Sequence, residues 1–364
     1  MFDECKLSNF QERSSKHFSS YGEIFIPASD LTTQLVIKDV EAQGKAIIKD
    51  TLSKLNIGHL ISFGVISAPS MRAFASRNDE GYLIGLHAGS IFYLYNLSRA
   101  MLSCSRIFPF LGAGDESVEF DLDYRTTAIY APINSFADLQ NTTRTSVGYR
   151  LFHQMVFWLV SHELSHIMHG HVDFCRSIGT LSVISDPDAP YADEATVLRN
   201  HAFEIMADGS ATIHSTSYTS NNVNFQNAWV DQIKRFEEVL PAILNIFSVA
   251  ALLRAFSPRS DVKLPAYTHP SANVRFAAVA SMHQLMMSRL KIPLTEAKSL
   301  LFSGPIDMCN FGFAHCGGKV DELGDWMTSA EVEAERFRLK EKADSMVNQD
   351  LRQFALYPID ARDA

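Results

Sequence analysis

One short segment combines residues that could hold a metal ion and move a proton. His162, Glu163 and His166 form an H-E-x-x-H pattern inside a segment whose composition predicts a helix. Histidines at positions i and i+4 share one helical face, so both imidazoles can reach a single metal ion while Glu163 lies beside them to accept a proton. This is the chemistry of a zinc peptidase. Because the helix is otherwise strongly apolar, burying these polar groups without a function would be costly, which favours a metal site over a chance match.

A catalytic zinc ion needs a third protein ligand and an open position for water. One known pattern, H-E-x-x-H-x-x-G-x-x-H, fails here because the chain has His169 in place of the glycine and Val172 in place of the third histidine. Metal binding by His169 or His171 is the weaker alternative, because a straight helix carries them away from the metal. We expect these two histidines to form hydrogen bonds or complement the helix end, and Gly170 to end the helix.

The favoured third ligand is Glu204, on a downstream segment that also has helical character. Glu204 and Asp208 are one helical turn apart, so one carboxylate can bind zinc while the other accepts a hydrogen bond from the outer nitrogen of a ligating histidine. The small residues Ala207, Gly209 and Ala211 would allow this helix to approach the first one closely. The alternative is a surface helix with two solvated acids.

These motifs resemble those of the gluzincin zinc metallopeptidases, in particular the group that contains the CAAX prenyl protease and the heat-shock protease HtpX. In that group the H-E-x-x-H helix is followed by a helix with E-x-x-x-D, which Glu204 and Asp208 match, and by a T-H-P-x-x-x-x-R segment, which Thr268 to Arg275 match. The motif order is also similar to that of the Lit phage-exclusion peptidase and its soluble bacterial relatives, where a glycine-histidine pair follows the box. The resemblance covers about residues 60–285.

The resemblance implies a role for each matching residue. Glu163 would be the general base, His269 would approach the oxygen that becomes negative during the reaction, Asp208 would support a zinc-binding histidine, and Arg275 would support the site. Zn²⁺ would be the cofactor, held by His162, His166 and Glu204. A structural role before Pro270 is the alternative for His269.

The sequence predicts an α+β fold that is predominantly helical, with a zincin-like metallopeptidase core made of a small β-sheet and the active-site helix that carries H-E-x-x-H. We expect an N-terminal arm and helix over residues 1–55, a zinc metallopeptidase domain over residues 56–290 with an insertion at 105–145, and a C-terminal extension over residues 291–364 that ends in a charged helix.

Hydrophobic periodicity and turn residues locate the individual elements. Helices are expected at residues 31–55, 88–102, 147–169, 194–216 and 239–253, and a charged helix from Thr328 to about Gln353. Strands are expected at residues 60–66, 71–75 and 82–87, the last two forming a hairpin. An extended substrate could pair with an exposed edge of the strand 82–87. The stripe of Val332, Leu339, Ala343 and Met346 favours a charged helix that packs on its own domain, with partner binding as the alternative.

Composition limits the possible partners and location. The 364 residues carry a formal net charge of -9, which argues against nucleic acid or an anionic membrane surface as the main partner. The apolar run at 239–253 is shorter than the roughly 20 residues of a membrane span, so a buried core helix is expected, with membrane insertion as the weaker alternative. The first residues lack the pattern of a secretion signal, and the expected location is cytoplasmic. Five scattered cysteines indicate reduced thiols, although Cys309 and Cys316 beside His315 could form a second metal site.

Together these features predict a zinc-dependent endopeptidase that acts on a protein or peptide substrate, with Glu163 activating the attacking water. The alternatives are a regulatory or interaction protein that keeps the peptidase fold without turnover, and a zinc hydrolase that acts on a small amide. A cytoplasmic protease must be restrained. We therefore expect a regulatory partner, or self-inhibition by the 105–145 insertion, the loop 172–193 or the C-terminal helix, as would suit a stress or phage-defence effector.

Overall fold

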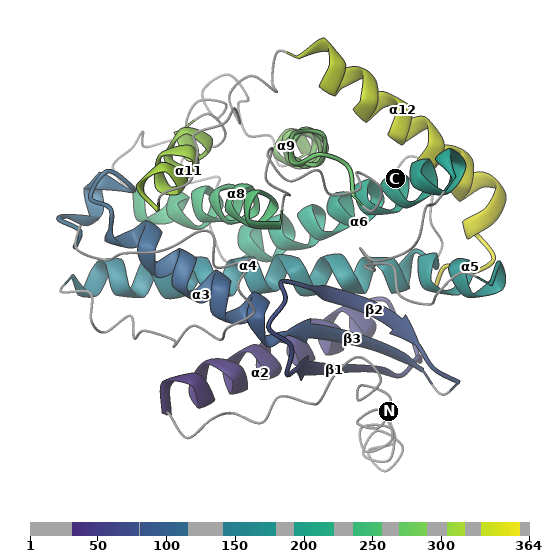
Figure 1. The fold of residues 1–364 in the computed structure, drawn as a ribbon, viewed down its shortest axis with the longest axis horizontal. Coiled ribbons are helices and arrows are strands. Elements are labelled where there is room, and N and C mark those ends of the chain that lie inside the picture. Colours follow the sequence, from purple (N-terminus) through teal and green to yellow (C-terminus); the bar gives the residue numbers. More distant parts are fainter. Residues whose placement is uncertain are drawn as a thin grey trace.

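The computed structural model describes eight parts of the chain, residues 31–79, 81–115, 141–179, 193–221, 236–256, 269–289, 304–316 and 329–356. Within these parts the chain is mostly helical and contains a three-stranded sheet (Figure 1), which confirms the predicted α+β fold class. Several predicted features lie outside the described residues: the arm 1–30, most of the 105–145 insertion, residues 180–192 of the loop 172–193, Thr268 and Thr328.

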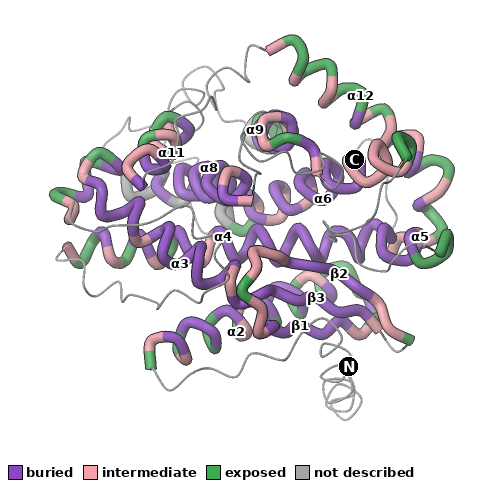
Figure 2. The backbone as a smooth tube through the Cα atoms, in the orientation of Figure 1, coloured by how far each residue is buried: buried purple, intermediate pink, exposed green. Residues whose placement is uncertain are grey.

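Helix α4 (Thr142–Met168) runs through the middle of the molecule and carries the H-E-x-x-H pattern. The side-chain oxygen of Asn141 begins the helix by accepting hydrogen bonds from the backbone N–H groups of Thr143 and Arg144. No proline interrupts the segment. All residues from 155 to 168 are buried (Figure 2), which is the pattern of a helix surrounded by protein on every side. The sheet lies on one side of α4 and a layer of helices on the other (Figure 1).

The sheet contains strands β1 (Ile61–Ile66), β2 (Ala73–Arg77) and β3 (Tyr82–His87) in the order β1-β3-β2. Strand β3 pairs with β1 in parallel and with β2 as the predicted antiparallel hairpin. Helix α2 (Leu31–Lys54) packs against β1 and α4.

The prediction that a substrate pairs with an exposed edge of residues 82–87 is wrong. Strand β3 is central, because the parallel partner β1 occupies the side that a simple hairpin would leave open. The two outer strands are buried at residues 61–66 and 73–76. The described sheet therefore presents no exposed edge along these residues.

The described parts contain five helices on the other side of α4: α6 (Glu194–Asn221), α8 (Phe236–Phe256), α9 (Ala272–Arg289), α11 (Gly304–His315) and α12 (Ala330–Met346). Helix α3 (Ala88–Ser103) follows β3 directly and crosses α4 (Figure 1). Helices α3, α6 and α8 each pack against α4, and α9 packs on α6 and α8. The predicted helices for 88–102, 194–216 and 239–253 are confirmed as α3, α6 and α8. Helices α9 and α11, and the short helix α5 (His171–Ser177), were not expected from periodicity.

The C-terminal helix α12 packs on its own domain, as its apolar stripe predicts. Leu339, Ala343 and Met346 are buried against α6 and α9. Ser329 begins the helix, with its side chain accepting a hydrogen bond from the backbone N–H of Val332. The helix passes directly into a π-helical turn at Val347–Leu351. The C-terminal segment thus returns to the helices that carry the candidate site residues.

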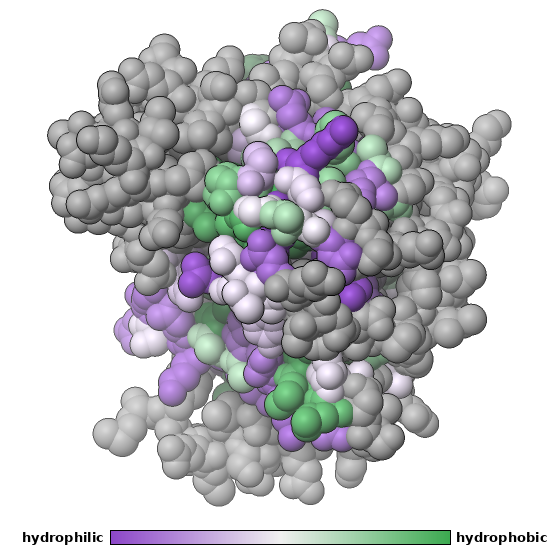
Figure 3. All heavy atoms as spheres, turned by 90° about the vertical axis from the view of Figure 1, so that its left-hand side faces the viewer, coloured by the Kyte–Doolittle hydropathy of each residue, from purple (hydrophilic) through white to green (hydrophobic). Residues whose placement is uncertain are grey.

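In the direction seen in Figure 3, the hydrophobic residues of the described parts form small patches among hydrophilic ones. Helix α8 is apolar, and its described side chains are buried except for those of Arg254 and Phe256, which are partly exposed. Among the described helices, none is both long enough and apolar enough to cross a membrane.

Candidate metal centre

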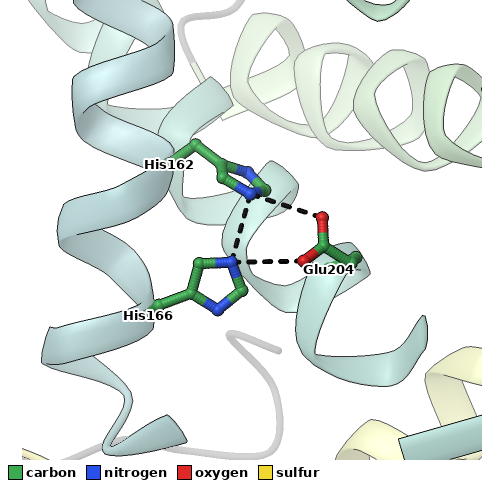
Figure 4. Close-up of side chains that lie close together, drawn as sticks. All are labelled: His162, His166 and Glu204. Carbon is green, nitrogen blue, oxygen red and sulfur yellow. Dashed lines mark hydrogen bonds and ion pairs between the residues drawn. The ribbon is translucent and has the colours of Figure 1, made fainter. Parts of the chain in front are cut away.

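Two buried helices bring three potential metal ligands together. His162 and His166 lie on α4, and Glu204 faces them from α6 (Figure 4). The Nε2 atoms of the two histidines are 3.1 Å apart. Glu204 Oε2 is 3.4 Å from His162 Nε2, and Glu204 Oε1 is 3.4 Å from His166 Nε2. In the described part of the chain these are the one group of three such residues whose ligand atoms all lie within 4.8 Å of one another, and all three are buried.

The donor set fits a zinc ion. Ligand atoms around a tetrahedral zinc with bonds of about 2.05 Å are roughly 3.3 Å apart, which matches the separations seen here. Neither carboxylate oxygen of Glu204 accepts a hydrogen bond, although the side chain is buried. Two imidazole nitrogens and a carboxylate that converge in the interior are costly unless a cation joins them. The three residues could therefore bind a metal ion, and they are compatible with zinc.

Asp208 lies one turn after Glu204 on α6 and faces the outer nitrogen of His162. Its Oδ1 atom is 2.9 Å from His162 Nδ1. Arg275 on α9 donates two hydrogen bonds to the same carboxylate, from Nε at 2.8 Å and from the NH2 group at 2.7 Å, and that NH2 group is 3.4 Å from Glu204 Oε2. A proton on His162 Nδ1 shared with Asp208 leaves the Nε2 lone pair facing Glu204, the form in which histidine binds a metal.

The electrostatics of this cluster favour positive charge at its centre. Burial opposes ionisation of Asp208, but the charge of Arg275 and its hydrogen bonds lower the Asp208 pKa below its ordinary value. Burial lowers the pKa of His162, yet its close contacts with the carboxylates of Asp208 and Glu204 outweigh burial and raise the pKa to about 10. When Glu163, Glu204 and Asp208 are ionised and His162 is in its neutral, metal-binding form, three negative charges face one positive charge on Arg275. A divalent cation would balance the remainder.

Glu163 follows His162 directly and is also buried. Its Oε2 atom has no hydrogen-bond partner. Burial raises the pKa of its carboxyl group to about 7, because a charged carboxylate is poorly solvated there. The structure thus holds Glu163 next to the three potential ligands in an environment where gaining and losing a proton cost little near neutral pH.

His269 joins the site from the residues just before α9. Its Nδ1 atom is 3.0 Å from Glu204 Oε2, and 35% of its side chain is exposed, compared with 1% for Glu204. His269 is not part of the group of three whose ligand atoms all approach one another. It is therefore the residue of the cluster that a molecule arriving from solvent would reach first.

The two histidines that follow the box stack on each other, with ring centroids 5.5 Å apart, and contact different polar partners. His169 Nε2 is 2.6 Å from the Ser210 hydroxyl on α6. His171 Nδ1 is 3.0 Å from His166 Nδ1, whereas Glu204 faces the other nitrogen of that ring, Nε2. Neither belongs to the group of potential ligands.

The small residues of α6, which were expected to allow a close approach to α4, have different surroundings. Ala207 and Ala211 are fully buried, whereas Gly209 lies beside Met282 of α9 instead of lining α4.

The alternative of a second metal site at Cys309 and Cys316 finds no support. Both residues are described and buried, and His315 is partly exposed, but they do not form a group with converging ligand atoms. Burial raises the pKa of both thiols, and that of Cys316 rises to about 12. Buried thiols of this kind stay protonated and pack as small apolar groups.

Comparison with known proteins gives one finding. Residues 119–291 match the sequence model of the family Peptidase U49. The matched range contains α4, α6 and α9, and the sheet lies outside it. It also contains the seven residues of the candidate centre, which are His162, Glu163, His166, Glu204, Asp208, His269 and Arg275. The match supports a peptidase. Neither the curated proteins nor the solved structures include a significant match to this chain.

Two contacts at the centre were not expected from the sequence. Trp158 stacks on His162 with ring centroids 5.3 Å apart. The signal was present, since Trp158 precedes His162 by one helical turn and so shares its face. The pairing of His171 with His166 carries no such periodic signal, because Gly170 interrupts the helix between them.

Proposed function

We propose that this chain is a zinc-dependent endopeptidase of the gluzincin type. The observation that carries the proposal is the convergence of His162, His166 and Glu204 from two buried helices, with the buried carboxyl group of Glu163 beside them. The Peptidase U49 match supports the same reaction class independently of this geometry.

In this proposal His162, His166 and Glu204 hold the metal. When bound, zinc supplies Lewis-acid chemistry, lowering the pKa of a water molecule and withdrawing electrons from a carbonyl oxygen. Glu163 accepts the proton of the attacking water and later delivers it to the leaving amine. His269 donates a hydrogen bond to the oxygen that becomes negative as the carbonyl is attacked.

Two further residues fix the geometry. Asp208 holds the ring of His162 through the contact at Nδ1, which keeps Nε2 directed at Glu204. Arg275 neutralises the Asp208 carboxylate, and its two hydrogen bonds to that carboxylate connect α9 to α6. Removing either Asp208 or Arg275 would leave the other with an unpaired charge in the interior, which is costly. The position of His162 therefore depends on both residues.

The substrate class and the wider role also belong to the proposal. We propose a protein or peptide substrate, and a role as a regulated stress or phage-defence effector in the cytoplasm. The similarity of the motif order to that of the Lit peptidase and the Peptidase U49 match support it. Restraint by a partner or by a segment of the chain remains part of the proposal. Of the candidate segments, α12 is described in full, and it lies on α6 and α9.

The test is metal-dependent proteolysis. The purified protein, loaded with zinc, is incubated with a cell extract, and new protein fragments are identified by mass spectrometry. We expect discrete fragments that a chelator abolishes and added zinc restores. The Glu204→Ala variant should lose both bound zinc and cleavage, whereas Glu331→Ala, a substitution of an exposed glutamate on α12, should keep both.

Two outcomes would contradict the proposal. Fragments that persist after chelation would exclude a metal-dependent reaction. A protein that binds zinc tightly but yields no fragment would favour a catalytically silent regulatory protein or a hydrolase of small amides, and model amide substrates separate these two.

A further inference from the structure

We propose that His171 is a positioning residue for His166, holding its ring by accepting a hydrogen bond from the outer Nδ1–H group. The inference rests on the proposed zinc site and extends it. The two Nδ1 atoms are 3.0 Å apart, and both side chains are fully buried. His162 has Asp208 at the equivalent nitrogen. His171 therefore occupies for the second histidine the place that a carboxylate occupies for the first.

The protonation pattern follows from the geometry. A neutral histidine that directs the Nε2 lone pair at a metal carries its proton on Nδ1, and that N–H group needs an acceptor. For His166 the atom in that position is Nδ1 of His171. His171 must then carry its own proton on Nε2. This assignment leaves His166 Nε2 free to face Glu204 Oε1, which is 3.4 Å away.

The unpartnered Nε2 atom of His171 indicates that this histidine does more than fill space in the core. Its Nε2 atom is buried without a hydrogen-bond partner. A buried polar group left unsatisfied costs about 1–3 kcal/mol, a penalty that a phenylalanine or leucine at this position would avoid. The ring already stacks on Phe203, with centroids 4.1 Å apart and an interplanar angle of 17°. An apolar ring could make this stack equally well, so what distinguishes histidine here is the acceptor at Nδ1.

The chain turns sharply to bring His171 to this position. Helix α4 ends at Met168, and Gly170 adopts a left-handed conformation with φ of 77°. In a continuous helix a residue five positions after His166 would lie roughly 140° around the axis from it and could not meet its ring. A side chain at position 170 would lie within 2.5 Å of the Phe354 backbone. The turn therefore requires glycine, and the C-terminal segment packs against it.

The experiment separates the hydrogen bond from the stacking. His171→Asn places an oxygen near the former Nδ1 atom and removes the ring, whereas His171→Phe keeps the ring and removes the acceptor. Zinc affinity is measured by competition with a chromogenic chelator. Thermal unfolding of the metal-free proteins shows whether each variant is folded. His283→Asn, which alters a buried histidine hydrogen-bonded to Thr216 on α6, is the matched control.

We expect His171→Phe to lose zinc affinity by roughly 10- to 100-fold, as removal of such partners does in other metal sites. His171→Asn and His283→Asn should stay within a few-fold of the wild type. Wild-type affinity in His171→Phe would overturn the inference and leave the proposed function intact, as would a loss confined to His171→Asn. A wild-type protein that binds no zinc would overturn both.

A second measurement needs no variant. In the zinc-loaded protein labelled with ¹⁵N, a hydrogen bond between the two rings gives a scalar coupling between His166 Nδ1 and His171 Nδ1. We expect this coupling, with the proton on His166. A proton on Nδ1 of His171, or a coupling that is absent, would overturn the assignment even if the variants failed to fold.

Discussion

The carboxyl group of Glu163 differs from the other acids of the centre in the way it is held. Asp208 accepts two hydrogen bonds from Arg275, and Glu204 faces both histidines of the box, so each has partners that keep it ionised. Burial instead raises the pKa of the Glu163 carboxyl group to about 7. A carboxylate whose charge is stabilised by its neighbours makes a poor base, whereas one whose pKa lies near 7 can accept a proton at little cost near neutral pH.

We therefore predict that Glu163→Gln keeps the metal but loses the reaction. Glutamine has the same shape and cannot accept the proton of the attacking water, so cleavage should fall by roughly 10²- to 10⁴-fold. Metal content by elemental analysis and the rate of fragment formation measure the two effects separately. Glu194→Gln is the control, because this side chain is 89% exposed and lies at the start of α6. Peptidase activity retained in Glu163→Gln would refute the role of Glu163 as base.

At the level of the elements, local sequence patterns predicted most of what carries the candidate site. The helix with H-E-x-x-H, the helix with Glu204 and the β2–β3 hairpin follow from periodicity and turn residues over short stretches. The parallel pairing of β1 with β3 does not, because it joins Ile61 to Tyr82 across an intervening strand. This non-local pairing made β3 central and overturned the expected substrate edge.

The contact of His171 with His166 escaped prediction for a related reason. Gly170 signals the end of a helix, but the direction of the chain afterwards depends on what packs against the turn. Here the packing partner is Phe354, and the backbone N–H of Leu356 donates to the Met168 carbonyl at the end of α4. Phe354 and Leu356 lie almost 200 residues after the H-E-x-x-H pattern in the sequence. The local sequence around that pattern therefore cannot predict the direction of the chain after Gly170.

Gly170→Ala should consequently destabilise the protein more than a comparable change elsewhere. Gly179 is the matched control, since it has a similar φ of 71° but nothing lies within 4 Å of an added Cβ atom. Gly179→Ala should cost only the left-handed conformation, about 1–2 kcal/mol. Gly170→Ala should lose more in urea unfolding, because its Cβ atom would displace Phe354. Amide exchange at Leu356 should also accelerate in Gly170→Ala alone, and equal losses in both variants would contradict the packing argument.

On the scale of the whole molecule, the interior also contains histidines that do not belong to the candidate metal centre. His87 lies at the end of β3 with its Nδ1 atom 2.7 Å from the Ser70 hydroxyl, and burial lowers its pKa to about 4. His283 on α9 is fully buried with its Nδ1 atom 3.0 Å from the Thr216 hydroxyl, and burial lowers its pKa to about 3. Both rings are neutral in the folded protein at pH 5, whereas an unfolded chain protonates them below about 6.5.

This difference predicts that acid destabilises the fold through the interior as well as through its carboxylates. Between pH 6.5 and 3 the unfolded chain binds a proton at position 283 that the folded protein does not, so stability falls as the pH falls. The contribution is about 1.4 kcal/mol for each pH unit below 6.5. His283→Asn should reduce the slope of unfolding free energy against pH by this amount between pH 6.5 and 4.5, and should leave the slope unchanged near pH 8. Urea unfolding of the metal-free proteins across this range provides the measurement. Parallel pH profiles for the variant and the wild type would show that His283 is already protonated in the folded protein.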